Sequence, residues 1–297
     1  MATAQTLTRP VVAVLAERSR RQQFMAAGLG EPRLLVFGGI VLLMVVIGIL
    51  APLLAPYDPY QTAPATTLQQ PSFAHFLGTD SLGRDQLSRV IFGTRISLAV
   101  AVIAVSISLG GGVSMGLAAG YIGGWLDQLL SRLIDAMLAF PGVLLAIAVT
   151  SALGPSLRNA MIAVGLIGIP LYFRLTRGQV LQAREQDYVM AAAVLGASRL
   201  RILVRHILPN IANPMIVAAS ISSSTAILAL AALGFLGIGP QPPDPDWGSM
   251  INAASSLLER SPWLSFGPGL AIFLTVFSFS MLGDGLRDAL DPRLRNR

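Results

Sequence analysis

Long stretches without a charged residue constrain this chain more than any other feature of its sequence. A helix needs about 20 apolar residues to cross roughly 30 Å of hydrocarbon. The uncharged stretches are 34–55, 96–126, 136–157, 159–173, 207–243 and 264–283. Only 12% of the 297 residues are charged, whereas a soluble domain carries about a quarter. We therefore expect an all-α membrane protein with about six transmembrane helices.

Two of these stretches need a further argument. Stretch 159–173 is short, and its helix can lengthen only if Arg158 or Arg174 extends its charged end toward the interface. Stretch 34–55 is not a signal peptide, because it begins late and the residues after it, 56–59, lack a cleavage site with small residues. We expect both stretches to span the membrane, and stretch 34–55 to be retained as a helix of the protein.

The distribution of arginine predicts the orientation of the chain. All 21 basic residues are Arg. With the N-terminus in the cytoplasm, 16 of them fall on the inner side and 5 on the outer side, as the positive-inside rule requires. We expect a multi-pass membrane protein with both termini cytoplasmic. The arginines cluster at helix ends, so the pI near 10.7 does not indicate a nucleic-acid partner.

The predicted spans divide the chain into five parts. They are a cytoplasmic N-terminal tail (1–33), an extra N-terminal transmembrane helix (34–55), an external segment (56–95), a five-helix core (96–285) and a cytoplasmic C-terminal tail (286–297). The core contains a cytoplasmic loop, 184–209, between the fourth and fifth spans.

Loop 184–209 has the pattern of two short helices. A first helix with a shared face is predicted before Gly196, a residue suited to the left-handed conformation that ends a helix; that face is Tyr188, Ala191, Ala192 and Leu195. Ser198 is placed to cap a second helix, which would lead into the fifth span at Pro209. The apolar stripe of this second helix is Leu200, Leu203, Val204, Ile207 and Leu208. An alanine-faced helix permits close approach by another protein, although a basic amphipathic segment can also simply lie on lipid.

The residues of this loop resemble a known motif. Two alanines, Ala191 and Ala192, are followed by Gly196 and then by His206-x-Leu208-Pro209. This pattern resembles the cytoplasmic "EAA" loop of bacterial ABC-importer permeases. In that family the loop forms the coupling helix that sits in a cleft of the ATPase subunit. One departure is that Met190 occupies the position of the motif's Glu.

Further motifs resemble the C-type permease of the dipeptide, oligopeptide and nickel ABC importers. They lie at 78–98, 233–239, 246–251 and 283–293. A second departure is Ser280, where the family pattern has Asn. The resemblance implies the type I ABC-importer permease fold and a coupling loop that contacts the ATPase. The coupling residues it implies are Asp187, Tyr188, Met190, Ala191, Ala192, Gly196, Arg201, Arg205, His206 and Pro209.

The resemblance also implies that the chain lies in the plasma (inner) membrane of a bacterium, and it implies the partners of the chain. They are a homologous second permease subunit, two ATP-binding cassette subunits, an external solute-binding protein and membrane lipid. ATP and Mg would be bound by the ATPase subunits, because a P-loop requires Lys and this chain has none. We expect no cofactor and no enzymatic activity in this chain.

The expected function is to form half of a translocation pathway for di- or oligopeptides. Nickel chelates or glutathione are alternative cargoes within the same importer class. A stand-alone secondary transporter or channel is the alternative outside it. That alternative predicts an acidic relay inside the membrane, and only Asp135 lies near the core.

The remaining candidates each have a structural alternative. The G-x-S-x-G motif at 112–116 would form a nucleophile elbow in a hydrolase, but its glycines also form the close-packing G-x-x-x-G pattern of membrane helices. We favour packing. Arg132 and Asp135 are spaced for an ion pair on one helix. Arg174 and Arg177 are expected as interfacial anchors.

Two groups of polar residues are candidates for contact or transport. Arg84, Asp85 and Arg89 precede the second span and could form internal salt bridges or contact an external partner. Ser220 and Ser224, one turn apart in the fifth span, could line the translocation pathway or bond to their own helix.

Overall fold

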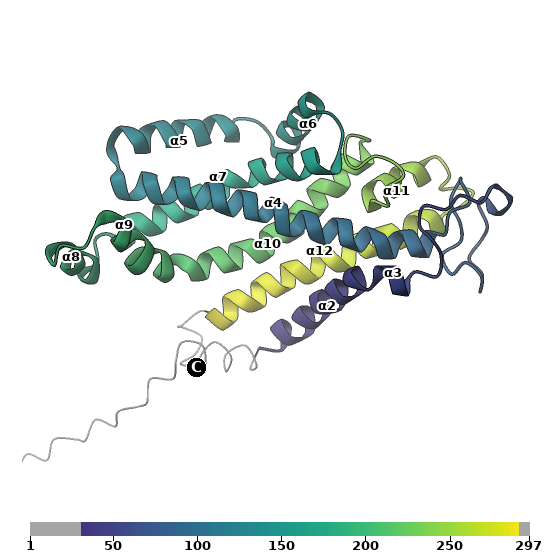
Figure 1. The fold of residues 1–297 in the computed structure, drawn as a ribbon, viewed down its shortest axis with the longest axis horizontal. Helices are drawn as coiled ribbons and strands as arrows, with labels where there is room; N and C mark the ends of the chain where they lie inside the picture. The colour runs from purple at the N-terminus through teal and green to yellow at the C-terminus, as the bar shows by residue number, and fades with distance from the viewer. Residues whose placement is uncertain (1–30, 291–297) are drawn as a thin grey trace, which may run out of the picture.

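The computed structural model describes residues 31–290, and the regular secondary structure in this range is helical (Figure 1). The longer helices are α2 (Pro32–Ile49), α4 (Gln86–Ile122), α5 (Gly124–Leu138), α6 (Gly142–Leu153), α7 (Leu157–Ala183), α10 (Leu208–Phe235) and α12 (Trp263–Leu290). The shorter ones are α3 (Ala51–Leu54), α8 (Asp187–Val194), α9 (Arg199–Arg201) and α11 (Trp247–Ser255), with a 3₁₀ turn at Pro64–Thr66 and a π-helix at Ile202–Ile207. The two predicted tails, 1–33 and 286–297, lie largely outside the described residues.

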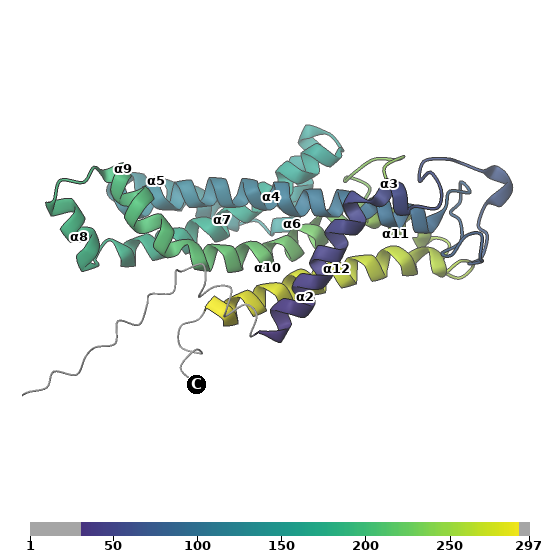
Figure 2. The ribbon, with the colours of Figure 1, turned by 60° about the horizontal axis from the view of Figure 1, so that its bottom comes forward.

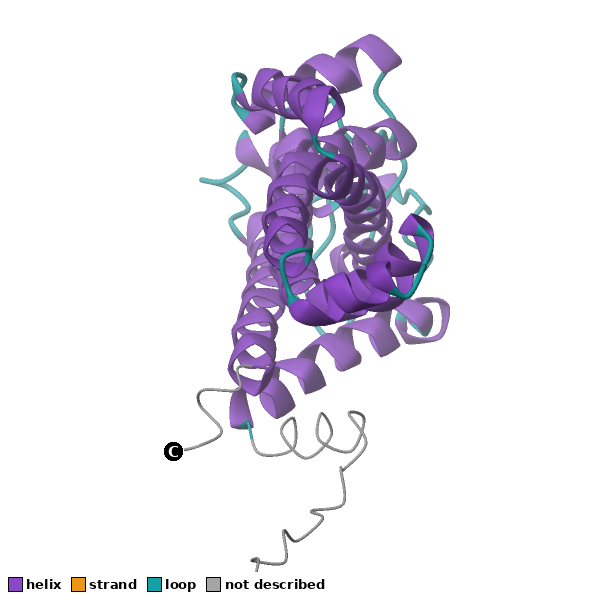
Figure 3. Ribbon diagram, turned by 90° about the vertical axis from the view of Figure 1, so that its left-hand side faces the viewer, coloured by secondary structure: helices purple, strands orange, loops and turns teal. Residues whose placement is uncertain are grey.

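The long helices run side by side in an elongated bundle (Figure 1). Helices α8 and α9 lie at one end, which we call the α8 end. The loops between α3 and α4, together with α11, lie at the opposite end. Figure 2 shows α2 crossing the bundle obliquely next to α12, and Figure 3 views the bundle from the α8 end.

Five helical segments in the described range are long and apolar enough to cross a membrane. The third predicted span, 136–157, is not a single helix. Helices α5 and α6 form one candidate span that is bent by 92° at residues 139–141. Pro141 explains the break, because it has no N–H to donate within a helix and stands just before α6. The structure therefore has five spans, or six if the bent pair counts as one.

Two ion pairs attach α5 to α7. Arg177 makes a bidentate contact with Asp127, with N–O distances of 2.6 and 2.7 Å. Arg174 Nη2 lies 2.9 Å from Asp135 Oδ1. Asp135 therefore pairs with Arg174 of α7 instead of the predicted Arg132. Arg174 and Arg177 both pair with carboxylates of α5, and their role as interfacial anchors stays a prediction. Sequence spacing suggested a pair within one helix, whereas the pairs form between neighbouring helices.

The tightest packing in the bundle joins α4 to α7. Each of three glycines on α4 faces a side chain of α7 so closely that an added Cβ would lie less than 3 Å from it. The facing pairs are Gly112 with Tyr172, Gly116 with Thr176 and Gly120 with Val180. The close-packing interpretation of the G-x-x-x-G pattern is thus confirmed. The G-x-S-x-G segment is helical, and the turn that a nucleophile elbow requires is not present there.

The extra N-terminal helix α2 packs against α12 and α4. At one end Arg33 contacts Asp288 at 3.3 Å. Further along, the rings of Phe37 and Phe277 meet edge to face with centroids 5.4 Å apart. Most of the α2 surface remains exposed in the isolated chain, so this helix lies at the periphery of the bundle.

Replacing Gly116 by Leu is expected to destabilise the protein by about 1–3 kcal/mol or more, because the side chain must enter the contact with α7. The matched control is Gly110→Leu on the same helix, since a Cβ at Gly110 has no atom within 4 Å. Thermal unfolding in mild detergent measures both. Equal melting temperatures for the two variants would contradict the packing role.

Candidate functional site

Helix α8 projects from one end of the bundle, and two of its side chains pack against the neighbouring elements. Val189 and Ala192 are buried in an apolar cluster with residues from α7, the π-helix and α10. The predicted shared face, Tyr188 to Leu195, is therefore only partly right: Ala192 is buried, but Leu195 is 87% exposed. The periodicity identified the helix, while the position of the neighbouring elements decided which face is covered.

The outer face of α8 is apolar and uncovered. Met190 is 50% exposed, Val194 88% and Leu195 87%. A cluster of exposed apolar side chains at the tip of a protein typically marks a contact site for another macromolecule. We call Met190, Val194 and Leu195 the α8 knob. Sequence analysis included Met190 in the predicted coupling loop but missed Val194, whose signal was its apolar character two residues before the terminating Gly196.

The turn after α8 fixes the direction of the chain. Gly196 has φ +79°, and its N–H donates to the carbonyl of Ala193. The N–H of Ala197 donates to the carbonyl of Ala192. This pair of bonds is a Schellman motif, which favours glycine at the left-handed position. Ser198 then accepts a hydrogen bond from the N–H of Arg201. The predicted stop at Gly196 and the predicted cap at Ser198 are both confirmed.

The second predicted helix of the loop continues into α10. Residues 199–235 form one helical segment that includes the π-helix Ile202–Ile207. Helix α10 begins at Leu208 with Pro209 in its first turn, as predicted, but the residues before it are also helical, so no break separates them from the fifth span. The buried residues are Ile202 and Ile207, whereas Leu200 is 71% exposed. The predicted stripe is therefore wrong at Leu200 and at Val204, which is 54% exposed. It is right at Ile207, and Leu203 and Leu208 pack partly against the apolar cluster behind α8.

The basic side chains of this segment lie on the outside. Arg199, Arg201 and Arg205 are exposed, and His206 is half-buried. Asp187 begins α8 and is exposed as well. The segment that follows α8 thus carries three exposed cations. These residues are brought to one end of the bundle, as the sequence predicted.

At the opposite end, Asp85 and Arg89 are inside the fold. Asp85 accepts a hydrogen bond from the N–H of Ser88, which caps α4, and its other oxygen lies 2.8 Å from His75 Nδ1. Arg89 is 4% exposed and donates to the carbonyls of Pro59 and Pro243. These bonds join the loops at this end of the bundle to α4, and they leave little of either side chain for a partner.

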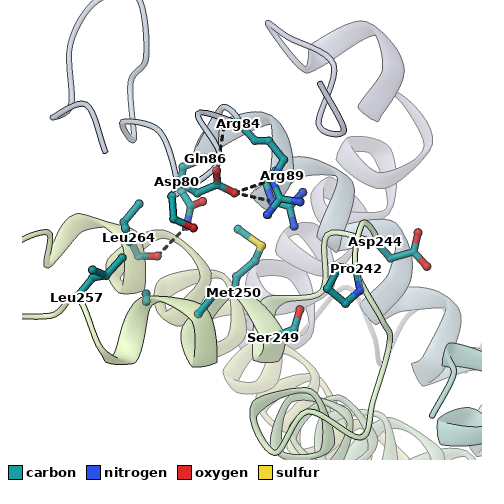
Figure 4. A pocket seen from close by; sticks show the side chains of 13 residues that line it. Asp80, Arg84, Gln86, Arg89, Pro242, Asp244, Ser249, Met250, Leu257 and Leu264 are labelled. Carbon is teal, nitrogen blue, oxygen red and sulfur yellow. Dashed lines mark hydrogen bonds and ion pairs between the residues drawn. The ribbon is translucent and has the colours of Figure 1, made fainter. Parts of the chain in front are cut away.

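A small pocket of about 80 Å³ lies beside Arg89 (Figure 4). Arg84 is fastened to Asp80 with an Nε–Oδ2 distance of 2.7 Å. Gln86 donates to the carbonyl of Leu264 at 2.7 Å. Figure 4 shows Asp244 at the other side of the pocket from these groups. Asp80 was not a candidate in the sequence analysis, although its carboxylate holds the Arg84 side chain beside the pocket.

A larger cavity of about 370 Å³ lies among α4, α6, α7 and α10. Among its lining residues, Ser222 and Thr225 supply hydroxyls from α10. Ser220 instead donates to the carbonyl of Phe279 on α12, and Ser224 donates to the carbonyl of Ile221. Of the two predicted pathway serines, Ser220 is therefore bonded to another helix and Ser224 to its own helix. The neighbouring Ser222 and Thr225 line the cavity instead.

Asp246 predicts a pH dependence of stability. It is buried at the N-terminus of α11, where burial raises its pKa from 3.8 to about 6 despite a hydrogen bond from the N–H of Ser249. The folded state therefore holds this proton more tightly than the unfolded state. The contribution of this carboxyl to the free energy of unfolding is fully present below about pH 4. It falls by about 3 kcal/mol as the pH rises through 6.

Asp246→Asn should remove this dependence, because the amide oxygen still accepts from Ser249 but the side chain cannot ionise. We expect the variant to gain stability relative to the native chain between pH 4.5 and 7.5. Unfolding measured in detergent at both pH values checks this expectation. A native chain that is more stable at pH 7.5 than the Asn variant, by the same margin as at pH 4.5, would contradict it.

Comparison with known proteins assigns this chain to a protein family. A family model described as binding-protein-dependent transport system inner membrane component matches residues 112–296. A model for the N-terminal TM domain of oligopeptide transport permease C matches residues 32–71. The first covers more than half of the chain, and the two together confirm the resemblance drawn from the motifs.

Individual relatives cover nearly the whole chain. The dipeptide transport system permease protein of Alkalihalophilus pseudofirmus is 46% identical over 269 residues, which are 90% of this chain and 88% of the relative. The glutathione transport system permease protein of Pectobacterium atrosepticum is 42% identical over 294 residues, covering 99% and 98%.

A solved structure shares the fold. It is the MetNI methionine ABC transporter in inward facing conformations, with a TM-score of 0.53, 17% identity, and coverage of 68% of this chain and 97% of that chain. The predicted importer-permease fold is thereby confirmed. The chain belongs to the binding-protein-dependent transport system inner membrane component family and is a multi-pass inner-membrane permease.

Proposed function

We propose that this chain is one of two permease subunits of an ATP-driven importer of short peptides. It would form half of the translocation pathway with a homologous permease. Two ATP-binding cassette subunits, which bind ATP and Mg, would dock at the α8 end. A solute-binding protein would dock at the opposite end. In this arrangement the α8 end and both termini are cytoplasmic, as the arginine distribution favours.

The α8 knob is the observation that carries this proposal. Its three apolar side chains project from the bundle at the end where the coupling loop was expected, while Val189 and Ala192 hold the helix from behind. An exposed apolar tip on a firmly packed base suits a contact that must transmit force. The missing Glu of the motif supports an apolar contact in place of an acidic one, because Met190 occupies that position.

The proposed cargo class follows from the relatives. Their names specify dipeptides, di- and tripeptides, or glutathione. Glutathione is itself a tripeptide, so one chemical class covers all of these names. A nickel chelate remains the alternative cargo. Transport assays with labelled dialanine, glutathione and nickel distinguish these cargoes.

The packing of the loop suggests how motion would be transmitted. The apolar cluster behind α8 joins the ends of α7 and α10 through Val180, Ile207 and Ile211. A displacement of α8 would therefore carry these two long helices with it as a unit. Rocking of packed helices about an interface can switch access between the two sides of a membrane.

The docking role predicts the effect of Leu195→Glu. A carboxylate placed in an apolar contact must lose its hydration without gaining a partner, so we expect about tenfold or more reduction in co-purified ATPase subunits. The tagged full chain, purified in mild detergent from its native host and analysed by quantitative mass spectrometry, provides the measurement.

Phe73→Glu is the matched control, because Phe73 is 98% exposed and belongs to the loops between α3 and α4, which lie at the opposite end of the molecule. It should retain the ATPase subunits. If Leu195→Glu retains them equally well, the α8 knob is not the docking site. If the native chain purifies alone and still transports, the stand-alone transporter becomes the better account.

The 370 Å³ cavity predicts a second result. Ser222→Trp should fill part of the cavity and lower peptide transport strongly, while the co-purified ATPase subunits remain. Ser106→Trp serves as control, because Ser106 is exposed on α4 and does not line this cavity. Unchanged uptake of labelled dialanine in the Ser222→Trp variant would remove this cavity from the pathway.

A further inference from the structure

A groove of about 530 Å³ lies on the surface of the bundle between α2 and α4. Arg95 is the one charged residue that lines it. The side chains of the groove walls are apolar and come from both helices: Val45, Ile49, Leu98, Ala99, Val102 and Ile103. The groove therefore combines a single cation with an apolar surface.

The groove arises from the way in which α2 meets α4. The two helices approach closely at Gly48, where an added Cβ would lie 3.3 Å from Leu98 Cδ1 and 3.8 Å from the Cα of Arg95. From this contact α2 runs obliquely across the bundle toward its own N-terminus (Figure 2). The close contact and the oblique course leave an open space between the two helices.

Arg95 lies near the level at which both helices leave the hydrocarbon. It is the last charged residue of α4 before the uncharged stretch 96–126. The 18 residues of α2 make about 27 Å of helix, close to the roughly 30 Å of hydrocarbon, and α2 ends at Ile49 beside this position. Ile103 lies about 12 Å further along α4. The charge is thus at the depth of lipid headgroups and the apolar walls are at the depth of lipid chains.

The Arg95 guanidinium is available to a ligand. Its side chain is exposed, and within residues 31–290 its recorded contact is with the ring of Phe92, whose centroid lies 5.9 Å from Arg95 Cζ. Phe92 in turn packs edge to face on Tyr60, with centroids 6.4 Å apart. The aromatic pair positions the cation without using its N–H groups. These donors match the oxygens of a phosphate, which Arg binds in a bidentate manner.

The groove faces away from the 370 Å³ cavity. The residues of α4 that line the two spaces do not overlap, and their mean directions differ by about 140° around the axis of a regular helix. Figure 1 shows α6, which lines the cavity, and α2 on opposite sides of α4. A second permease at the proposed pathway would stand on the side of α6, so the groove is left to lipid.

We propose that this groove binds one anionic glycerophospholipid, with its phosphate on Arg95 and an acyl chain along the apolar walls. A cation at the membrane surface attracts anionic headgroups. The apolar walls fix the position of the chain but add little selectivity, because apolar contact is available throughout the bilayer. The site is independent of the proposed cargo and of the ATPase contact, since it requires only that α2 and α4 span the membrane.

Photo-crosslinking lipids test the site directly. The full chain, with the subunits that co-purify, is placed in nanodiscs of phosphatidylcholine that contain a trace of a lipid with a diazirine in one acyl chain. The probe is either phosphatidylglycerol or phosphatidylcholine with the same chains, and mass spectrometry maps the adducts. We expect phosphatidylglycerol to label 45–49 and 98–103 about fivefold more than phosphatidylcholine does.

Two pairs of variants separate the charge from the groove. Arg95→Gln should lower labelling by phosphatidylglycerol to the level of phosphatidylcholine. Arg158→Gln is its control, because Arg158 is an exposed arginine of α7 outside the groove lining. Val102→Trp should lower labelling by both lipids, because the indole occupies the groove. Leu42→Trp is the matched control, since Val102 is 67% and Leu42 63% exposed but only Val102 lines the groove.

Three outcomes would overturn the proposal. The first is equal labelling of the groove by the two lipids in the native chain. The second is an equal loss of labelling in Arg95→Gln and Arg158→Gln. The third is a groove that neither lipid labels, which would mean that another protein covers this face.

Discussion

The close contact between α4 and α7 is the constraint on which the rest of the structure depends. Between membrane helices there is little hydrophobic driving force, so small residues that allow backbones to approach provide much of the association. The three glycines of α4 let it lie directly on α7. Ser108 strengthens the contact by donating to the carbonyl of Gly165 at 2.7 Å. The other elements are positioned relative to this pair.

The two ends of the bundle differ in how their elements are held and in which surface they expose. At the α8 end, α7 continues into a short helix that is held by an apolar cluster and leaves its outer face uncovered. At the opposite end, the starts of α4, α11 and α12 converge. Asp85 and Arg89 bond α4 to the loops, and Trp247 of α11 donates to the carbonyl of Val90 on α4 at 3.0 Å. The α8 end therefore suits an apolar contact, whereas the opposite end is polar and held together by hydrogen bonds.

Sequence analysis predicted the features that depend on local chemistry. The apolar stretches predicted the spans, Gly196 and Ser198 predicted the turn after α8, and the spaced glycines predicted a close helix contact. The errors concern features that depend on tertiary neighbours. The partners of Asp135 and Arg174 lie on different helices, and the buried face of α8 is set by α7 and α10. The bend at Pro141 had a local signal that the continuous apolar run concealed.

The central claim is that the α8 knob contacts the ATPase subunits. The most direct test introduces a photo-crosslinking amino acid in place of Val194, which is 88% exposed, and irradiates the complex in native membranes. The account predicts a covalent adduct with a P-loop ATPase subunit from this position and none from position 73. Adducts with lipid alone at position 194, while the ATPase subunits still co-purify with the chain, would contradict it.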